Sequence, residues 1–547
     1  HKSRRVEQFT KSAAPGQEGP ADSTRSQPAA LGHRSRRSRR HARAAGPFSQ
    51  ALAPVLDPIL RRVSRWTPLT SFMVTAAGFL VLGWLQKVPC LRVGHSDTGA
   101  PIIDWSGNRQ FTTACYNDQV ALFVSHGLDR LAVPYFFSWE SGGEARYMEY
   151  PVLSGFYQYA AAAVARPIHG AWQWLGLPGV PAESVYFAVS CVGLATCWLV
   201  SVALIAKLAG NRARDSFLMA ASPLVIVHAF TNFDLLSVLF AVGFLAAWAQ
   251  SRPALAGVLG GLGVAAKLWP AFILGAILLL CLRAKAWGPL VRMLVGAVVT
   301  WLAVNLPIAI MAPEGWGEFF RLNSVRGWEG STIYAVIAHM IGSDSWNGTN
   351  PSQAIAGVQP LNMITFALLA ACLLALAVAV VFLFRTPPRL AQVAFLAVAA
   401  FMLTNKVWSP QYSIWLVPLI VVAIPRWRLT FVWATVEMVY WYLRMWQFLP
   451  ANEAAPYWLV DTVTLLRIGL ILAMVGLIIR DMRYPERDVV RSAHSGRDPL
   501  VGNLPGDSPA WRINPRTSVR TDRSGGQLAR AGGVRKEKGG KDHPQEQ

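Results

Sequence analysis

The chain has 547 residues, of which 53% are hydrophobic and only 15% are charged. Soluble domains carry about 25% charged residues, so this composition excludes an ordinary soluble protein, and six cysteines are too few to staple a chain of this length. The net charge is +21, of which residues 1–66 contribute +10 and residues 480–547 contribute +5. These values predict a polytopic membrane protein with basic ends.

Residues 1–66 form the first predicted segment, a basic tail without apolar periodicity. Six arginines lie between residues 34 and 43, and such a run is compatible with nucleic-acid binding. The run precedes the first apolar span, however, where positive charge is expected on the cytoplasmic side. We therefore predict a disordered cytoplasmic anchor that contacts anionic lipids, and no nucleic-acid partner.

The middle of the chain, residues 67–480, is predicted to be one all-α integral membrane domain. A span needs about 20 apolar residues. The candidate spans are residues 69–87, 152–172, 184–207, 215–230, 232–250, 253–283, 289–311, 360–385, 390–405, 409–425, 428–447 and 459–480. They predict a bundle of about 12 transmembrane helices, and an even count agrees with two basic, cytoplasmic termini.

The topology between residues 152 and 283 stays open at this level. Twelve simple spans place Lys207, Arg212 and Arg214 outside the cell, against the tendency of positive charge to stay inside. In a second layout, residues 152–172 are re-entrant or interfacial and 253–283 forms a short hairpin with Lys267 at its external tip. Both layouts keep an even count, and the sequence does not choose between them.

Two loops, residues 88–150 and 312–358, are extracytoplasmic in both layouts. They are rich in Trp, Tyr, Arg, Asp and Glu, and loops often carry chemistry when helices form the scaffold. Trp and Tyr also gather at membrane interfaces, but 22 tryptophans exceed that need, so we expect a polar ligand with stacking surfaces. Cys90 and Cys115 both lie in the first loop, either as a disulfide or as two free thiols.

Two carboxylates of the first outer loop are candidates for general-base chemistry. Asp118 lies in Cys115–Val120, and Glu149 stands at the start of the next apolar segment, followed by Tyr150. A carboxylate held near a low-dielectric surface has a raised pKa and can accept a proton from an attacking hydroxyl group. The alternative is a pair of solvated carboxylates that form ion pairs with Arg109, Arg130 or Arg146, and composition alone favours it.

Charges near or within the spans are further candidates. Asp234 opens one span, Lys267 interrupts another beside Pro270, and Lys406 lies between two spans on the expected outer side. Intramembrane charges are costly and are functional hypotheses by default. A lysine at a broken helix could hold an anionic phosphate, although a lysine whose ammonium group extends from a helix end to the interface is an equal alternative.

The remaining features point away from other chemistries. Cys191, Cys197, Cys281 and Cys372 lie in spans and are interpreted as packing residues, as is His228. The sequence has no cysteine or histidine metal-ligand spacing, no P-loop and no dinucleotide-binding glycine motif, so it does not support an ATP-driven pump or a nucleotide-sugar enzyme. The sequence indicates no certain cofactor, and it leaves open a divalent cation that no motif supports. Residues 481–547 predict a second disordered cytoplasmic tail.

Four segments in order carry a family resemblance over roughly residues 115–425. They are CYNDQV, with GLDR and PY after it, MEYPVLSGFYQY, the long run from NFDLLS to AAKLWP, and NKVWSPQYSIWLVP. This set resembles the polytopic glycosyltransferases of the GT-C superfamily. More narrowly, it is similar to the actinobacterial mannosyltransferases that depend on polyprenyl-phosphate-mannose.

The resemblance implies an inverting membrane glycosyltransferase that uses a polyprenyl-phosphate sugar, with mannose the expected sugar, on the extracytoplasmic face of the cell (inner) membrane. A glycolipid or glycan of the cell envelope is the implied acceptor. Asp118 matches the position of the general base. Lys267, Lys406 and Arg326 match basic positions that stabilise the donor phosphate. The implied sugar and acceptor pocket comprises Glu149, Tyr150, Asp234, Trp408, Gln411 and Tyr412.

Three alternatives remain beside this function. Arabinofuranosyl or other pentosyl transfer would use the same mechanism. A lipid-linked sugar flippase or transporter would be expected to show an internal repeat, and the 232–270 pattern has no convincing second copy. A membrane scaffold that recruits partners through basic tails would tolerate replacement of the outer-loop carboxylates.

Overall fold

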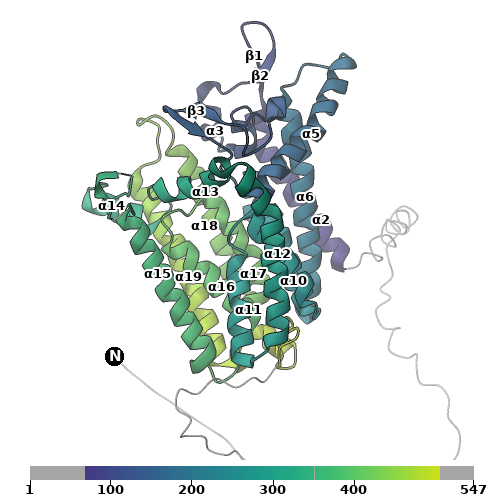
Figure 1. Ribbon diagram of the computed structural model, residues 1–547, viewed down its shortest axis with the longest axis vertical. Helices are drawn as coiled ribbons and strands as arrows, with labels where there is room; N and C mark the ends of the chain where they lie inside the picture. The colour runs from purple at the N-terminus through teal and green to yellow at the C-terminus, as the bar shows by residue number, and fades with distance from the viewer. Residues whose placement is uncertain (1–67, 350, 356, 506–547) are drawn as a thin grey trace, which may run out of the picture. The chain divides into compact units, whose positions relative to one another are not determined.

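The computed structural model describes residues 68–505 except residues 350 and 356 (Figure 1). The predicted N-terminal tail, 1–66, and residues 506–547 of the predicted C-terminal tail lie outside the described residues. Within the described part the architecture is a helical bundle, as expected, with two small hairpins at one end. Strand β1 (Val93–His95) pairs antiparallel with β2 (Pro101–Ile103), and β3 (Trp139–Ser141) pairs with β4 (Glu144–Arg146).

The helices follow the apolar segments of the sequence. In chain order the α-helices are α2 (Pro68–Lys87), α3 (Arg109–Thr112), α4 (Asp118–Ala121), α5 (Val152–Trp174), α6 (Ala182–Leu208), α7 (Phe217–Ala220), α8 (Pro223–His228), α9 (Asp234–Ala249), α10 (Pro253–Ala266), α11 (Ala271–Ala284), α12 (Trp287–Met311), α13 (Pro313–Val325), α14 (Ile333–Ile341), α15 (Pro360–Val378), α16 (Leu390–Thr404), α17 (Leu416–Ala423), α18 (Trp427–Trp446), α19 (Tyr457–Arg483) and α20 (Val489–Ala493). A π-turn, Ala379–Leu383, extends α15, and a 3-10 turn, Pro410–Trp415, precedes α17.

Five helical stretches within the described residues are long and apolar enough to cross a membrane. They are Pro68–Leu91, Ala182–Leu208, Trp287–Met311, Pro360–Leu383 and Tyr457–Arg483. Five further apolar helical stretches have only 10–17 residues. The fold is therefore that of a polytopic membrane protein, whereas the count of 12 spans stays a prediction, because several predicted spans are shorter than a straight crossing requires.

The predicted span 253–283 is broken in the middle. Helix α10 ends at Ala266, Lys267 has extended backbone angles, and Pro270 precedes the first turn of α11. Proline cannot donate a backbone hydrogen bond inside a helix, so the chain reverses here instead of continuing. This break is the short hairpin of the second layout.

Helix α10 reaches this break packed closely against α12. A side-chain carbon at Gly257 would clash with the carbonyl group of Met293, and one at Gly261 would clash with that of Ala297. Small residues let membrane helices approach until their backbones touch. Glycine on α10 therefore sets the position of the turn that carries Lys267.

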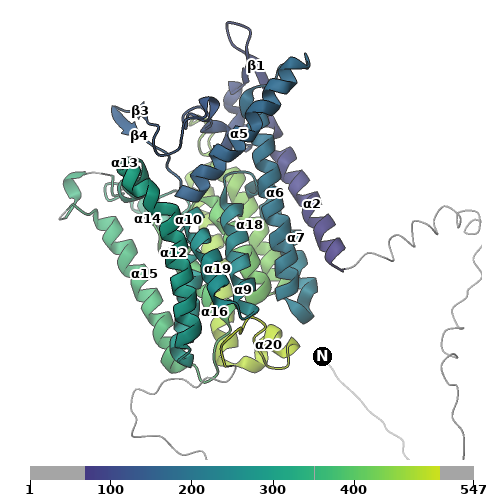
Figure 2. The same ribbon diagram turned by 45° about the vertical axis from the view of Figure 1, so that its right-hand side comes forward.

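Helix α5 lies at one end of the bundle, and its interfacial placement in the second layout stays a prediction. Figures 1 and 2 show it at the hairpin end of the bundle, beside β1. Its last residue, Trp174, is 86% exposed, and the turn that follows brings Gly179 against Pro101 of β2. The helix therefore projects from the end that carries the hairpins and does not run to the far end.

The opposite end of the bundle, which carries α20, gathers basic residues. Asn211 bonds through its backbone N–H to His494, and Arg491 donates to the carbonyl of Pro387 at 2.7 Å. The 210–216 turn therefore lies at the same end as the loop that contains Arg385 and Arg389. This placement removes the charge conflict of the twelve simple spans, because Arg212 and Arg214 share one end with the other basic turns.

Residues 485–505 are part of the folded bundle, although the sequence assigned them to a disordered tail. Asp488 caps α20 and forms a buried ion pair with Arg389, with 2.6 Å between Asp488 Oδ2 and Arg389 Nε. Leu500 is fully buried. This segment has a low apolar content, so its composition predicted disorder. Its order comes from long-range polar contacts, which local composition does not reveal.

The two loops that were predicted to be extracytoplasmic contain short elements rather than unstructured chain. The first holds both hairpins, α3 and α4, and the second holds α13 and α14. Cys90 and Cys115 form a disulfide, which decides between the two alternatives left open by the sequence. The disulfide joins the end of the first long apolar stretch to the segment that leads into α4.

Candidate functional site

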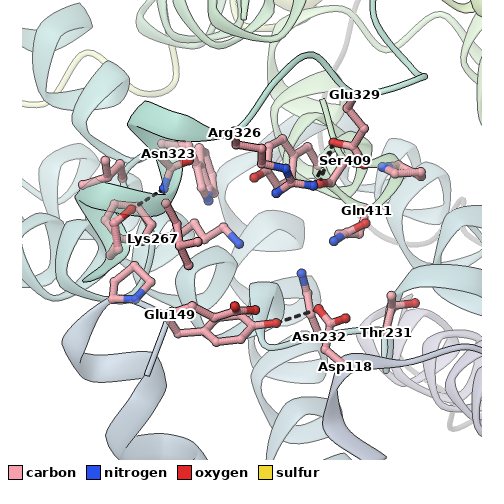
Figure 3. Close-up of a pocket in the computed structure, with 18 of the residues that line it drawn as sticks. Asp118, Glu149, Thr231, Asn232, Lys267, Asn323, Arg326, Glu329, Ser409 and Gln411 are labelled. Carbon is pink, nitrogen blue, oxygen red and sulfur yellow. Dashed lines mark hydrogen bonds and ion pairs between the residues drawn. The ribbon is translucent and has the colours of Figure 1, made fainter. Parts of the chain in front are cut away.

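A cavity of about 840 Å³ opens at the hairpin end of the bundle. This volume falls in the range of about 300–1,000 Å³ typical of small-molecule sites. Figure 3 shows Asp118 and Glu149 on one side, Arg326, Glu329 and Ser409 on the other, and Lys267 and Gln411 between them. The polar and charged lining residues are Tyr116, Asp118, Arg146, Glu149, Tyr150, Thr231, Asn232, Lys267, Asn323, Arg326, Glu329, Ser409, Gln411, Tyr412 and Arg444.

Asp118 is placed by the local sequence on both of its sides. The Asn117 side chain caps α4 by accepting from the backbone N–H of Val120 at 2.9 Å, so Asp118 is the first residue of the helix. Its own N–H donates to the carbonyl of Thr231 at 2.8 Å. These bonds anchor the backbone while leaving the carboxyl group on the cavity wall.

The Asp118 carboxyl group has a tyrosine partner. Tyr150 Oη donates to Asp118 Oδ2 at 2.6 Å. Burial raises the pKa of the Asp118 carboxyl, and the hydroxyl groups of Tyr150 and Tyr116 oppose that rise because they stabilise the carboxylate. A carboxylate with a raised pKa and an open cavity beside it is suited to accept a proton.

Glu149 is a second carboxylate of the cavity and has no hydrogen bond or ion pair within the described part of the chain. Burial and the nearby Asp118 charge both raise the pKa of the Glu149 carboxyl. Neither carboxylate pairs with the arginines named as alternatives: Arg109, Arg130 and Arg146 pair with Asp104, Asp129 and Glu318, respectively. The structure thus overturns the interpretation of Asp118 and Glu149 as partners of these three arginines.

Lys267 projects into the cavity from the break between α10 and α11. Its Nζ lies 2.9 Å from Asp234 Oδ1, and Trp415 Nε1 donates to the other carboxylate oxygen of Asp234 at 3.1 Å. Asp234 is buried and does not line the cavity. It orients Lys267 instead, whose ammonium group lies 5.2 Å from the centre of the Tyr412 ring. The second alternative for Lys267, an ammonium group extended to the interface, is therefore not what the structure shows.

Arg326 supplies the second cationic group of the cavity. It follows α13, and its guanidinium lies 3.7 Å from Glu329 Oε2. Glu329 also accepts from Ser409 Oγ at 3.0 Å. The pKa of Arg326 is raised above its ordinary value because the carboxylates of Glu329 and Glu149 outweigh the effect of burial. Arg326 therefore stays cationic in the cavity.

Lys406 is close to this group but does not line the cavity. Its ammonium group donates to the carbonyl groups of Ser324 and Arg326 and so fixes the loop that carries the Arg326 guanidinium. Burial and the Arg326 charge lower the pKa of Lys406 to about 8. The side chain that the sequence placed on the donor phosphate is an internal support of the loop instead.

The segment after Lys406 contributes aromatic and amide groups. Gln411 and Tyr412 line the cavity, and the Tyr412 ring stacks on Trp415 with 4.1 Å between ring centres. Trp408 is 1% exposed and faces away from the cavity, where the Arg467 guanidinium lies 4.3 Å from its ring centre. Trp408 is therefore a packing residue and makes no direct contact with the cavity.

The site predicted from the sequence did not include eight of the polar and charged lining residues: Tyr116, Arg146, Thr231, Asn232, Asn323, Glu329, Ser409 and Arg444. Tyr116 lies two residues before Asp118, Asn232 lies two residues before Asp234, and Arg444 sits in the last turn of α18. An arginine inside the predicted span 428–447 was the available signal for Arg444. Tyr116 and Asn232 stand beside chosen residues, but polar residues at helix starts are too common to single them out.

No group of three or more His, Cys, Asp or Glu side chains between residues 68 and 505 is arranged to hold a metal ion. Asp118 and Glu149 form a pair without a third such ligand.

Comparison with known proteins finds one matching family model. The model of glycosyltransferase family 87, a family of GT-C-type polytopic membrane proteins, matches residues 157–410. Over these residues the chain is similar to glycosyltransferase family 87. No curated protein sequence matches the chain.

The match to family 87 indicates a membrane glycosyltransferase, a class of enzyme that uses a sugar donor and an acceptor as substrates. The matched residues include Lys267, Arg326 and Lys406, whereas Asp118 and Glu149 precede them. In the folded chain Asp118 and Glu149 line one cavity together with Lys267 and Arg326, whereas Lys406 does not line it.

Proposed function

We propose that this protein transfers a sugar from a polyprenyl-phosphate donor to a hydroxyl group of a cell-envelope glycolipid or glycan, with Asp118 as the general base. The observation that carries the proposal is the facing arrangement of a partly buried carboxylate and two cations, Lys267 and Arg326, in one cavity. We take mannose as the sugar because the four sequence motifs resemble mannosyltransferases. The reaction takes place on the extracytoplasmic face.

The bond changes follow from these groups. Asp118 removes the proton of the acceptor hydroxyl group as its oxygen attacks the anomeric carbon of the donor. The bond from that carbon to the phosphate oxygen breaks, and polyprenyl phosphate departs with the electron pair. One direct displacement inverts the anomeric configuration. The proton ends on Asp118 and is released to solvent.

Negative charge accumulates on the departing phosphate oxygen, so cations near that oxygen accelerate the reaction. Lys267 and Arg326 serve this purpose. Asp234 keeps Lys267 directed to the cavity, and Lys406 holds the carbonyl group of Arg326. The donor therefore places its phosphate between the α10–α11 break and the end of α13.

Sugar hydroxyl groups need polar partners and flat surfaces. Glu149, Asn232 and Gln411 offer acceptors and donors on the cavity wall, and Tyr412 offers an aromatic face. Because Glu149 has no protein partner within residues 68–505, it is free to accept from a sugar hydroxyl group. The Tyr150 hydroxyl group donates its hydrogen bond to Asp118 and so helps orient the base.

The test compares wild type with Asp118→Asn in transfer of labelled mannose from polyprenyl-phosphate-mannose to membrane acceptors. Asparagine keeps the size of the side chain and removes its basicity, so we expect turnover to fall by about two to four orders of magnitude. Asp129→Asn is the matched control, because Asp129 lies in the same loop and outside the cavity. Equal transfer by Asp118→Asn and wild type would refute the assignment of the base.

A further inference from the structure

Each residue of the segment 114–118, which ends at Asp118, makes a hydrogen bond or a disulfide that holds it in place. Gln86 Nε2 and Trp441 Nε1 both donate to the carbonyl of Ala114, at 2.7 and 2.8 Å. Cys115 is joined to Cys90. Lys87 Nζ donates to the carbonyl of Tyr116 at 3.1 Å. Beyond it, Asn117 caps α4 and the N–H of Asp118 is bonded to Thr231.

Half of these contacts come from the end of α2 and the turn that follows it. Gln86 and Lys87 are its last two residues, and Cys90 follows in the next turn. Helix α2 is itself seated closely on α8, because a side-chain carbon at Gly83 would meet the carbonyl of Val225. Gln86, Lys87 and Cys90 at the end of α2 therefore form a fixed support for the segment 114–118. We call these three residues the platform.

The backbone of this segment would not hold its shape unaided. Ala114 has a φ of +53°, in the left-handed region that residues with a side chain rarely adopt. Strained conformations of this kind persist only where surrounding contacts impose them. The two hydrogen bonds to the Ala114 carbonyl and the adjoining disulfide are such contacts.

Lys87 is the unusual member of the platform. Its side chain is fully buried, and no carboxylate in the described part of the chain lies within ion-pair distance of it. Its ammonium group has the Tyr116 carbonyl as hydrogen-bond partner and lies 4.7 Å from the centre of the Trp441 ring. Burying a charge with so few partners is expensive, and an apolar residue of the same length would pack here at lower cost.

We propose that Lys87 is a positioning residue that sets the location of the Asp118 carboxylate through the Tyr116 carbonyl, with Gln86 and the Cys90–Cys115 disulfide as the rest of the platform. The inference rests on the proposed role of Asp118 as base. Lys87 does not line the cavity and makes no contact with substrate. Its effect falls on the distance and direction between base and acceptor hydroxyl group.

The test measures kcat and KM of Lys87→Met for donor and acceptor. A shift of the base by about 1 Å can cost about a hundredfold in rate. We therefore expect kcat to fall by about ten- to a hundredfold, with both KM values nearly unchanged. Lys207→Met is the matched control, because Lys207 is exposed in the last turn of α6 and lies outside the cavity. It should keep wild-type kcat.

Disulfide content and thermal unfolding of each variant separate positioning from folding. A merely structural role for Lys87 would lower the yield or the melting temperature and leave kcat per folded molecule unchanged, which would overturn the inference. If Lys87→Met does not fold, Gln86→Leu tests the same platform through the Ala114 carbonyl. Loss of that one neutral hydrogen bond should lower kcat by about fivefold, and an unchanged kcat would again overturn it.

The Asp118→Asn variant distinguishes the two levels of the proposal. Inactive Asp118→Asn with fully active Lys87→Met and Gln86→Leu keeps the base and overturns the platform. Active Asp118→Asn overturns the base, and the inference falls with it.

Discussion

At the scale of single residues, the proposed base and the two proposed phosphate-binding cations each have a neighbour that orients the side chain or supports its loop. Tyr150 donates to Asp118, Asp234 holds Lys267, and Lys406 supports the loop of Arg326. The pairing of Asp118 with a hydroxyl group rather than a cation is decisive for a base. A cation at hydrogen-bond distance would stabilise the carboxylate so strongly that it would become a poor proton acceptor.

The Tyr150–Asp118 bond makes a prediction about pH. Asp118 must be ionised to act, and burial raises the pKa of its carboxyl, so kcat/KM should decline on the acid side at a pH above the ordinary aspartate range. Tyr150→Phe removes a bond to the charged form, which raises that pKa further. The acid limb should therefore move to higher pH.

A pH–rate profile of Tyr150→Phe checks this shift. Tyr157→Phe is the control, because the Tyr157 hydroxyl donates to the carbonyl of Ser190 and not to Asp118. An acid limb that stays in place or moves to lower pH in Tyr150→Phe would contradict the assigned partnership.

At the scale of elements, helix positions follow from apolar length, and turns follow from proline and charge. The predicted span 232–250 corresponds to α9, Asp234–Ala249. The predicted span 459–480 corresponds to α19, Tyr457–Arg483. Pro270 in the sequence predicted the helix break at Lys267. The sequence could not show which helices α10 would touch, because glycine permits close approach without naming the partner.

The contact between α10 and α12 predicts the effect of one added methyl group. Gly257→Ala should lower the free energy of unfolding by about 1–3 kcal/mol, because the new carbon clashes with the Met293 carbonyl. Gly275→Ala on α11 is the matched control, because nothing lies within 4 Å of its added carbon. Thermal unfolding in detergent measures both. Equal melting temperatures for the two variants would refute the close packing.

At the scale of the whole molecule, the two ends of the bundle differ. One end carries the hairpins and the cavity, and the other carries α20 and the basic turns. The candidate residues Asp118, Lys267 and Gln411 are separated by hundreds of positions, yet line one cavity. Asp118 and Lys267 were chosen as charged groups near predicted span ends, and Gln411 was implied by the family resemblance; the roles of all three stay predictions. Lys406, Trp408 and Asp234 were also expected at the site but do not line the cavity, because side-chain direction depends on tertiary packing.

The basic end makes a prediction about stability. Asp488 carries the C-terminal segment onto the bundle by pairing with Arg389, and both side chains are buried. Asp488→Ala should cost about 3–5 kcal/mol, because it leaves the Arg389 charge buried without its carboxylate. Glu486→Gln, at an exposed position two residues earlier, should leave the melting temperature unchanged. A stable Asp488→Ala would show that the segment is not held by this pair.

The most direct test of the central claim is to measure donor binding and sugar transfer by Asp118→Asn on the same purified sample. If Asp118 is the base, this variant binds polyprenyl-phosphate-mannose as tightly as wild type, since Lys267 and Arg326 are intact, but transfers little or no sugar. A variant that binds the donor and still transfers mannose at the wild-type rate would contradict the account.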